Sequence, residues 1–142
     1  MTQFKPVQVH FDDLDAMGLL HNSRYALLVE RAVSAFWTEA GWRFDPALSK
    51  FKDVYMVVRE FKIVYNSPVM GAGDVLVEFW LERMGRTSGV YGFRVLSADR
   101  TVVHAEGHRV NVNLDSTTLR PTPFSPEIRE AAAVLMREPA AC

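Results

Sequence analysis

The feature that most limits how this chain can fold is one long amphipathic segment at residues 23–40. Plotted on a helix at about 100° per residue, its apolar side chains form one wide arc, and Arg31, Ser34 and Thr38 lie opposite. The arc consists of Tyr25, Val29, Ala32, Val33, Phe36 and Ala40, with Ala26 and Trp37 at its margins. Gly41 follows and is expected to end the helix in a left-handed conformation. So wide an arc predicts a helix that is largely covered by a β-sheet.

Most of the remaining chain alternates between polar and apolar residues, the period that is typical of half-buried β-strands. The pattern predicts strands at residues 7–11, 54–65, 75–81, 88–96 and 101–114. Ser125, Pro126 and Glu127 provide an N-cap, a first-turn proline and a first-turn acid, which predict a second helix to about residue 137. Strands in hairpin-like succession after one buried helix indicate an α+β fold in which an antiparallel sheet curls around the helix.

Composition restricts the classes of partner and compartment. With 16 basic and 17 acidic residues the formal net charge is −1, so we expect no surface for nucleic acid or anionic lipid. No apolar run approaches the roughly 18 residues of a membrane span. The only cysteine, Cys142, is the last residue, and the first residues lack the apolar core of a signal peptide, so we expect a reducing, cytoplasmic setting. The chain has no internal repeat, and residues 1–142 are expected to form a single domain.

An acidic segment precedes the long helix. Asp12, Asp13 and Asp15 are followed by Gly18 and then by Asn22, where the helix is expected to begin. Free backbone N–H groups make the start of a helix electropositive. A carboxylate at this position could attack a carbonyl carbon or take a proton from water. The N–H groups of the helix start would polarise the same carbonyl. From the residues alone, the segment is either such a catalytic site or an acidic helix cap on a solvated loop.

Residues around this segment carry a resemblance to a known family. They are Asp13-Leu14-Asp15, Gly18, Asn22, Tyr25 and Glu30-Arg31-Ala32. Over about residues 5 to 130 the chain resembles the hotdog-fold acyl-CoA thioesterases of the 4-hydroxybenzoyl-CoA thioesterase type. The resemblance implies an antiparallel β-sheet wrapped around a long central helix, and hydrolysis of an acyl-CoA thioester to a carboxylic acid and free CoA, with no cofactor. It also implies a homodimer or homotetramer whose acyl sites lie at the subunit interface.

The same resemblance suggests roles for single residues. Asp15 matches the catalytic carboxylate of the resembling enzymes, which acts as nucleophile or general base, and Asn22 matches the position whose backbone N–H helps to hold the thioester oxygen. Asp13 matches a position that is more often structural in that family. Gly18 and Tyr25 stand at the family spacing and are expected beside the substrate.

Two side chains leave alternatives open. Many family members carry His-Val-Asn-Asn after the glycine, whereas this chain has Leu19-Leu20-His21-Asn22. The displaced His21 either orients Asp15, contacts the substrate or has no chemical role. Glu30, on the helix, is either a second carboxylate of the site or the partner of a basic residue at the subunit interface.

A second candidate segment is Gly85-Arg86-Thr87-Ser88. It resembles the strand start at which family members hold the phosphates of coenzyme A. Arginine suits bidentate contact with phosphate, and the hydroxyls of Thr87 and Ser88 add donors beside Arg86. The alternative is an ordinary polar strand end.

Other chemistries find less support. His104, Glu106 and His108 share one face of a strand, but flat strands keep such side chains roughly 7 Å apart, too far for zinc without a bend, so no metal is expected. The Gly-x-Ser-x-Gly and Gly-x-x-x-x-Gly-Lys motifs are absent. The altered segment Leu19-Leu20-His21 keeps one alternative function open, a non-catalytic acyl-CoA-binding module or sensor. The sequence is compatible with an acyl group delivered by CoA or by acyl carrier protein.

Overall fold

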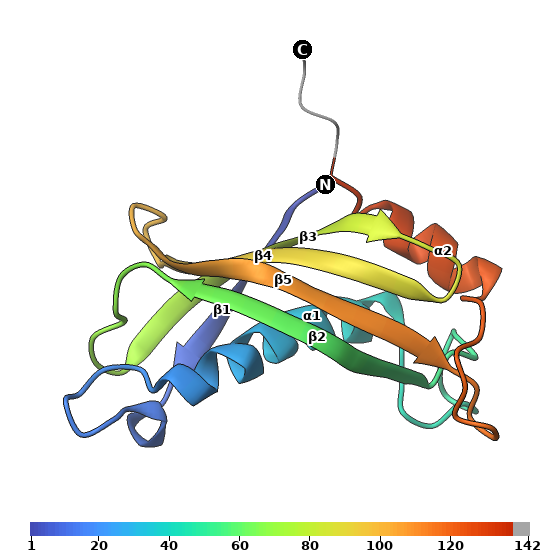
Figure 1. Cartoon of the computed structure of the whole chain (residues 1–142), viewed down its shortest axis with the longest axis horizontal. Coiled ribbons are helices and arrows are strands. Elements are labelled where there is room, and N and C mark those ends of the chain that lie inside the picture. The colour runs from blue at the N-terminus through green and yellow to red at the C-terminus, as the bar shows by residue number, and fades with distance from the viewer. Residues whose placement is uncertain (138–142) are drawn as a thin grey trace, which may run out of the picture.

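One antiparallel sheet and one long helix build the fold in the computed structural model, which describes residues 1–137 (Figure 1). The five strands follow the order β1-β3-β4-β5-β2 across the sheet. They are β1 (Gln3–Val9), β2 (Tyr55–Tyr65), β3 (Gly73–Met84), β4 (Ser88–Ser97) and β5 (Val103–Leu114). The helices are α1 (Tyr25–Ala40) and α2 (Pro126–Ala133), and two short 3₁₀ turns are η1 (Phe11–Asp13) and η2 (Asn22–Arg24). The expected α+β hotdog arrangement is confirmed. Cys142, the only cysteine, lies outside the described residues.

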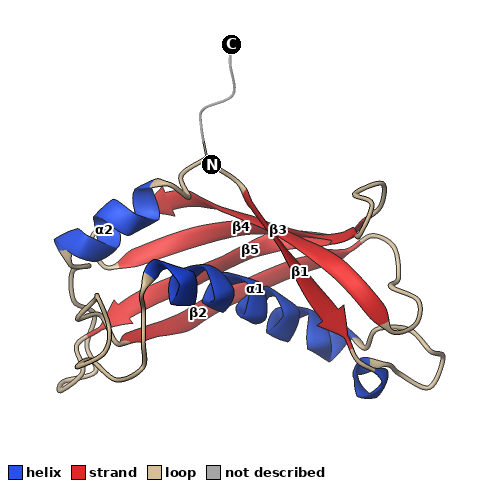
Figure 2. Cartoon of the chain, turned by 180° about the vertical axis from the view of Figure 1, so that it is seen from behind, coloured by secondary structure: helices blue, strands red, loops and turns tan. Residues whose placement is uncertain are grey.

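Helix α1 runs diagonally across the inner face of the sheet, and α2 covers one end of the same face (Figure 2). The side chains of Leu28, Val29 and Ala32 are completely buried there, in the same apolar cluster as Phe79 and Phe93. Leu28 was not part of the predicted arc, so the buried face of α1 is wider than the sequence indicated. No helix among residues 1–137 is long and apolar enough to cross a membrane.

Gly41 ends α1 as predicted. Its φ is +109°, a left-handed conformation that glycine adopts without steric cost. Its N–H donates to the Thr38 carbonyl at 3.1 Å, which satisfies one of the last free carbonyls of the helix. Gly41, directly after the helix, therefore determines where α1 ends and how long it is.

Strand β2 is an edge of the sheet and carries a bulge that the sequence pattern did not predict. The register against β5 shifts between Val58 and Glu60, so one extra residue separates the two halves of the strand. Phe61 packs inward on Phe93 with ring centroids 5.2 Å apart, whereas Val57 turns away from the core and is 41% exposed. Unbroken alternation through the strand predicted at residues 54–65 would place Val57 and Phe61 on one face, and the bulge between Val58 and Glu60 reverses this alternation.

The first strand also differs from its prediction. It begins at Gln3 and ends at Val9, so Phe11 lies in η1 and is 85% exposed instead of half-buried. The alternation of Val7, Val9 and Phe11 continues past the strand end, where pairing with β3 has already stopped at Gly73. Periodicity alone does not mark where strand pairing ends.

A buried carboxylate holds the end of the sheet where α1 terminates. Asp53 is only 5% exposed, and its Oδ2 accepts hydrogen bonds from the Asn113 amide and the Ser125 N–H, both at 3.0 Å. The Ser125 hydroxyl also donates to Asp53 and, as predicted, caps α2 by accepting the N–H of Ile128. Asp53 thereby ties the loop before β2 to β5 and to the start of α2.

Replacing Asp53 by alanine is predicted to lower the free energy of unfolding by about 1–3 kcal/mol, because the buried N–H and hydroxyl of Ser125 lose their acceptor and Asn113 loses one of its three. Urea unfolding monitored by circular dichroism measures the change. The control is Asp74→Ala, an exposed carboxylate on β3, which is expected to change stability by less than about 0.5 kcal/mol. Equal stability of both variants would contradict this role of Asp53.

Candidate active site

The acidic segment folds into a tight loop between β1 and α1. Leu14 pairs with Leu20, and Leu19 pairs with Met70, across short β-bridges. Gly18 has a φ of +77°, donates its N–H to the Asp15 carbonyl and accepts a hydrogen bond from Gly71, both at 3.0 Å. A residue with a Cβ would be strained in this conformation, so Gly18 shapes the loop through its backbone.

Asp13 is the buried carboxylate of the loop and is only 4% exposed. Its Oδ2 accepts the N–H of His10 at 2.8 Å, and Arg24 lies 3.6 Å from its Oδ1. Its backbone carbonyl also accepts the N–H of His21 at 2.9 Å. Both carboxylate oxygens therefore hold the loop and the start of the helix together.

Asp15 is placed differently. Its Oδ1 accepts the N–H groups of Met17 and Leu19 at 2.8 and 3.1 Å, and no donor within residues 1–137 bonds to its Oδ2. Asp15 lines a surface pocket of about 340 Å³. The other lining residues are Leu19, Leu20, His21, Asn22, Tyr25, Tyr65, Asn66, Ser67 and Pro68. One oxygen thus fixes the carboxylate, and the other remains available to a ligand.

The helix start lies in the same pocket. Asn22 begins the turn η2, and Arg24 has helical dihedrals, so this turn leads directly into α1. No acceptor for the backbone N–H of Asn22 is found in the described part of the chain. The pocket therefore contains a carboxylate and the electropositive start of a helix.

His21 points its Nδ1 back at the helix. The Ser23 N–H donates to this nitrogen at 3.1 Å, and the Ser23 hydroxyl oxygen lies 2.8 Å from it. Because a backbone N–H can only donate, Nδ1 is an acceptor and the neutral ring carries its proton on Nε2. His21 can therefore donate a hydrogen bond through Nε2.

Two tyrosines form the wall opposite the loop. Tyr25 is 3% exposed and meets Tyr65 edge to face, with ring centroids 5.0 Å apart. Burial raises the pKa of Tyr25 above its ordinary value, so its phenol stays protonated. The Tyr65 hydroxyl donates to the Asn22 carbonyl at 3.1 Å and so restrains the helix start. Sequence reasoning assigned Tyr65 only to a strand face, since its contact with residue 22 depends on tertiary pairing.

The segment predicted to hold coenzyme A phosphates lies at the other end of the sheet. Strand β3 begins at Gly73, beside the Asp15 loop, and ends at Met84, just before Gly85, so its 12 residues span about 36 Å at 3.3 Å of rise per residue. The carbonyls of Arg86 and Thr87 accept the N–H groups of Phe124 and Asn113, and Ser88 begins β4. A single chain does not bring these residues to Asp15.

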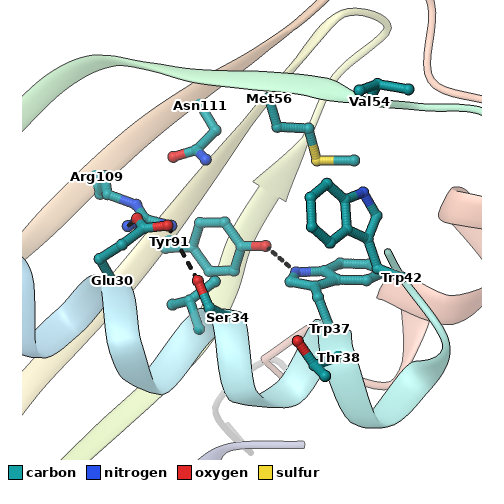
Figure 3. A pocket seen from close by; sticks show the side chains of 11 residues that line it. Glu30, Ser34, Trp37, Thr38, Trp42, Val54, Met56, Tyr91, Arg109 and Asn111 are labelled. Carbon is teal, nitrogen blue, oxygen red and sulfur yellow. Dashed lines mark hydrogen bonds and ion pairs between the residues drawn. The ribbon is translucent and has the colours of Figure 1, made fainter. Parts of the chain in front are cut away.

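Glu30 lines a second cavity, of about 160 Å³, under the second half of α1 (Figure 3). Its carboxylate pairs with Arg109 of the same chain and accepts the Ser34 hydroxyl at 3.1 Å. Among residues 1–137 the basic partner of Glu30 is therefore Arg109 on β5, whereas the sequence allowed a basic partner at a subunit interface.

The three residues considered as metal ligands contact different groups. His104 bonds the Ser67 carbonyl, His108 pairs with Glu60, and Glu106 faces Arg94. Within residues 1–137, no group of three or more His, Cys, Asp or Glu side chains is arranged to hold a metal ion.

Comparison with known proteins shows the family of this chain and agrees with its fold. Residues 9–132 match the family model described as the thioesterase-like superfamily. The acyl-CoA thioester hydrolase YbgC of Escherichia coli O6:H1 is 25% identical over 116 residues, which cover 82% of this chain and 84% of that protein. A predicted thioesterase from Bacillus stearothermophilus superposes with a TM-score of 0.82 at 25% identity, covering 99% and 100% of the two chains. A thioesterase from Thermus thermophilus, complexed with coenzyme A and Zn, has a TM-score of 0.77 at 25% identity, covering 96% and 95%.

Proposed function

This chain belongs to the thioesterase-like superfamily, and from that premise we propose that it is a cytoplasmic enzyme that hydrolyses an acyl-CoA thioester to a carboxylic acid and free CoA. The observation that carries the proposal is the pocket shared by the open oxygen of Asp15 and the helix start at Asn22. Names of relatives, such as acyl-CoA thioester hydrolase and a thioesterase with bound coenzyme A, support the same substrate class.

In the proposed reaction the thioester oxygen accepts the Asn22 N–H, and the carbonyl carbon faces Asp15. Negative charge that develops on this oxygen is stabilised by the N–H and by the dipole of α1. As a nucleophile, Asp15 Oδ2 bonds to the carbon, the C–S bond breaks, CoA leaves as a thiolate, and water then cleaves the anhydride. As a general base, Asp15 takes a proton from water, whose oxygen attacks, and the departing sulfur receives the proton.

His21 adds a donor to this arrangement. With its proton on Nε2, the ring can donate to an oxygen or sulfur atom of the thioester while Ser23 holds its other nitrogen. This supports contact with the substrate among the three alternatives that the sequence left open. Tyr25 and Tyr65 line the same pocket and add aromatic surface beside the reacting group.

The site is completed, in this proposal, by a second copy of the chain. The free edge of β2 carries Val57, Val58 and Val64 at 41 to 50% exposure, an apolar surface that pairing would cover. Two-fold antiparallel pairing through β2 brings the start of one β2 beside the end of the other. The partner subunit's Arg86 then lies at the same end as Asp15, where it can bind a coenzyme A phosphate.

Replacement of Asp15 by asparagine is predicted to lower turnover by roughly 10²- to 10⁴-fold, because the reaction loses its positioned base or nucleophile. A panel of acyl-CoA esters with detection of free thiol measures it. The asparagine oxygen can still accept the N–H groups of Met17 and Leu19, so the loop is expected to keep its shape.

The matched control is Asp12→Asn, an exposed carboxylate of the same loop, which is expected to retain full turnover. Undiminished turnover of the Asp15 variant would refute the catalytic role. Tight binding of an acyl-CoA by the wild-type protein without thiol release from any ester would instead support the alternative, a non-catalytic binding module or sensor.

Replacement of Val58 by lysine is predicted to convert the dimer to monomers and to lower turnover, because a charge on the β2 edge opposes pairing. Size-exclusion chromatography with light scattering gives the mass, and circular dichroism checks the fold. The control is Val134→Lys beyond α2, since Val134 is 51% exposed and Val58 50%. A wild-type protein that is monomeric and fully active would contradict the shared site.

A further inference from the structure

The second cavity differs in character from one end to the other (Figure 3). At one end the indoles of Trp37 and Trp42 lie beside Met56 and form an apolar wall. At the other end lie Arg109 and Asn111, inward residues of β5, with Glu30 of α1 against Arg109. The cavity is therefore an apolar chamber with a polar group of side chains at one end.

Two atoms of that polar end lack partners although they are buried. Arg109 is 3% exposed, and its Nε has no hydrogen-bond partner among residues 1–137, while its Nη1 pairs with Glu30. Asn111 is 9% exposed, and its Oδ1 likewise has none within this part of the chain. Buried polar atoms without partners reduce the stability of a fold. Because Arg109 and Asn111 line the same cavity, their unpartnered atoms indicate that the cavity binds a ligand with polar groups.

Tyr91 contributes a third polar group beside them. Its hydroxyl oxygen accepts the indole N–H of Trp37 at 2.8 Å, so the hydroxyl hydrogen remains available to an acceptor in the cavity. Burial raises the pKa of Tyr91 above its ordinary value, which keeps this hydrogen in place at neutral pH. The Arg109 guanidinium lies 5.4 Å from the Tyr91 ring centroid.

Charge and size restrict what this cavity accepts. Glu30 neutralises Arg109, so a further carboxylate would lose water without gaining a net positive charge. A hydroxyl group on the ligand suits these side chains better, because it can accept a hydrogen bond from Tyr91 or Arg109 and donate one to Asn111. A volume of about 160 Å³ compares with the roughly 150 Å³ of an engineered cavity that binds benzene. The cavity therefore fits a neutral group of modest size with one hydroxyl.

The cavity and the Asp15 pocket both lie between α1 and β2. Tyr25 lines the first pocket and Glu30 the second, five residues further along α1, which at about 1.5 Å per residue is roughly 8 Å. We propose that this cavity receives the far end of the acyl group, and that Arg109, Asn111 and Tyr91 select acyl groups that carry a hydroxyl there. This inference rests on the proposed thioesterase function.

The test compares octanoyl-CoA with its counterparts that carry a hydroxyl or a carboxylate on the terminal carbon. Wild-type protein is expected to favour the hydroxyl ester by about tenfold in kcat/KM, and Asn111→Leu is expected to abolish that ratio. Leucine has a similar volume and leaves no unpartnered polar atom, so the variant is expected to be at least as stable as wild type. Because the ratio is measured on one protein sample, partial unfolding cancels. A preference for the octanoyl or carboxylate ester would overturn the inference.

A binding measurement separates this inference from the proposed reaction. Calorimetry gives the Kd of each ester for the Asp15→Asn variant, with and without Asn111→Leu. Tighter binding of the hydroxyl ester that Asn111→Leu abolishes supports the site even if no ester is hydrolysed. Hydrolysis with equal Kd values for all esters would overturn the inference and leave the reaction standing. Should the Asn111 variant fail to fold, Tyr91→Phe removes another donor, and an unchanged Kd ratio in that variant counts against the site.

Discussion

The structure depends on the burial of α1 against the inner face of the sheet. Leu28, Val29 and Ala32 lose all solvent exposure there, and Phe79 and Phe93 do so from the strands. Each fully buried large apolar side chain contributes about 1.5–3 kcal/mol, so this interface outweighs any single hydrogen bond of the protein. The interface fixes the direction of α1 across the strands. Its electropositive start therefore lies at one end of the sheet, beside the loop that carries Asp15.

Asp13 and Asp15 lie in the same loop, but their different surroundings give them different roles. Asp13 is buried, and its oxygens face the His10 N–H and Arg24, so it stabilises the loop. Asp15 is half-buried and uses only Oδ1 for the loop. A carboxylate that is fixed through one oxygen and open through the other is pre-organised for chemistry, because its position costs little entropy when a ligand arrives.

Local signals in the sequence were sufficient for much of this architecture. The period of α1, its Gly41 stop and the Ser125 cap of α2 depend only on neighbouring residues, and each was predicted correctly. The residues that were missed depend on pairing between distant segments. The bulge of β2 turns Val57 outward, and Tyr65 reaches the helix start only because β2 lies opposite it. Neither contact leaves a signature in the local pattern.

Strand β5 explains why the second cavity could not be predicted. Its inward-facing residues are Ala105 in the first half of the strand and Arg109, Asn111 and Asn113 in the second half. Val112 faces the outer side. Hydrophobic periodicity would therefore assign the wrong face to the core in this half of the strand. The inward position of Asn113 has a structural reason, since its amide donates to Asp53 and to the Thr122 and Pro123 carbonyls. Asn111 forms no such bond among the described residues. Its burial on the inner face has no counterpart in the hydrogen bonds of these residues, and the ligand proposed for the second cavity would supply the missing partner.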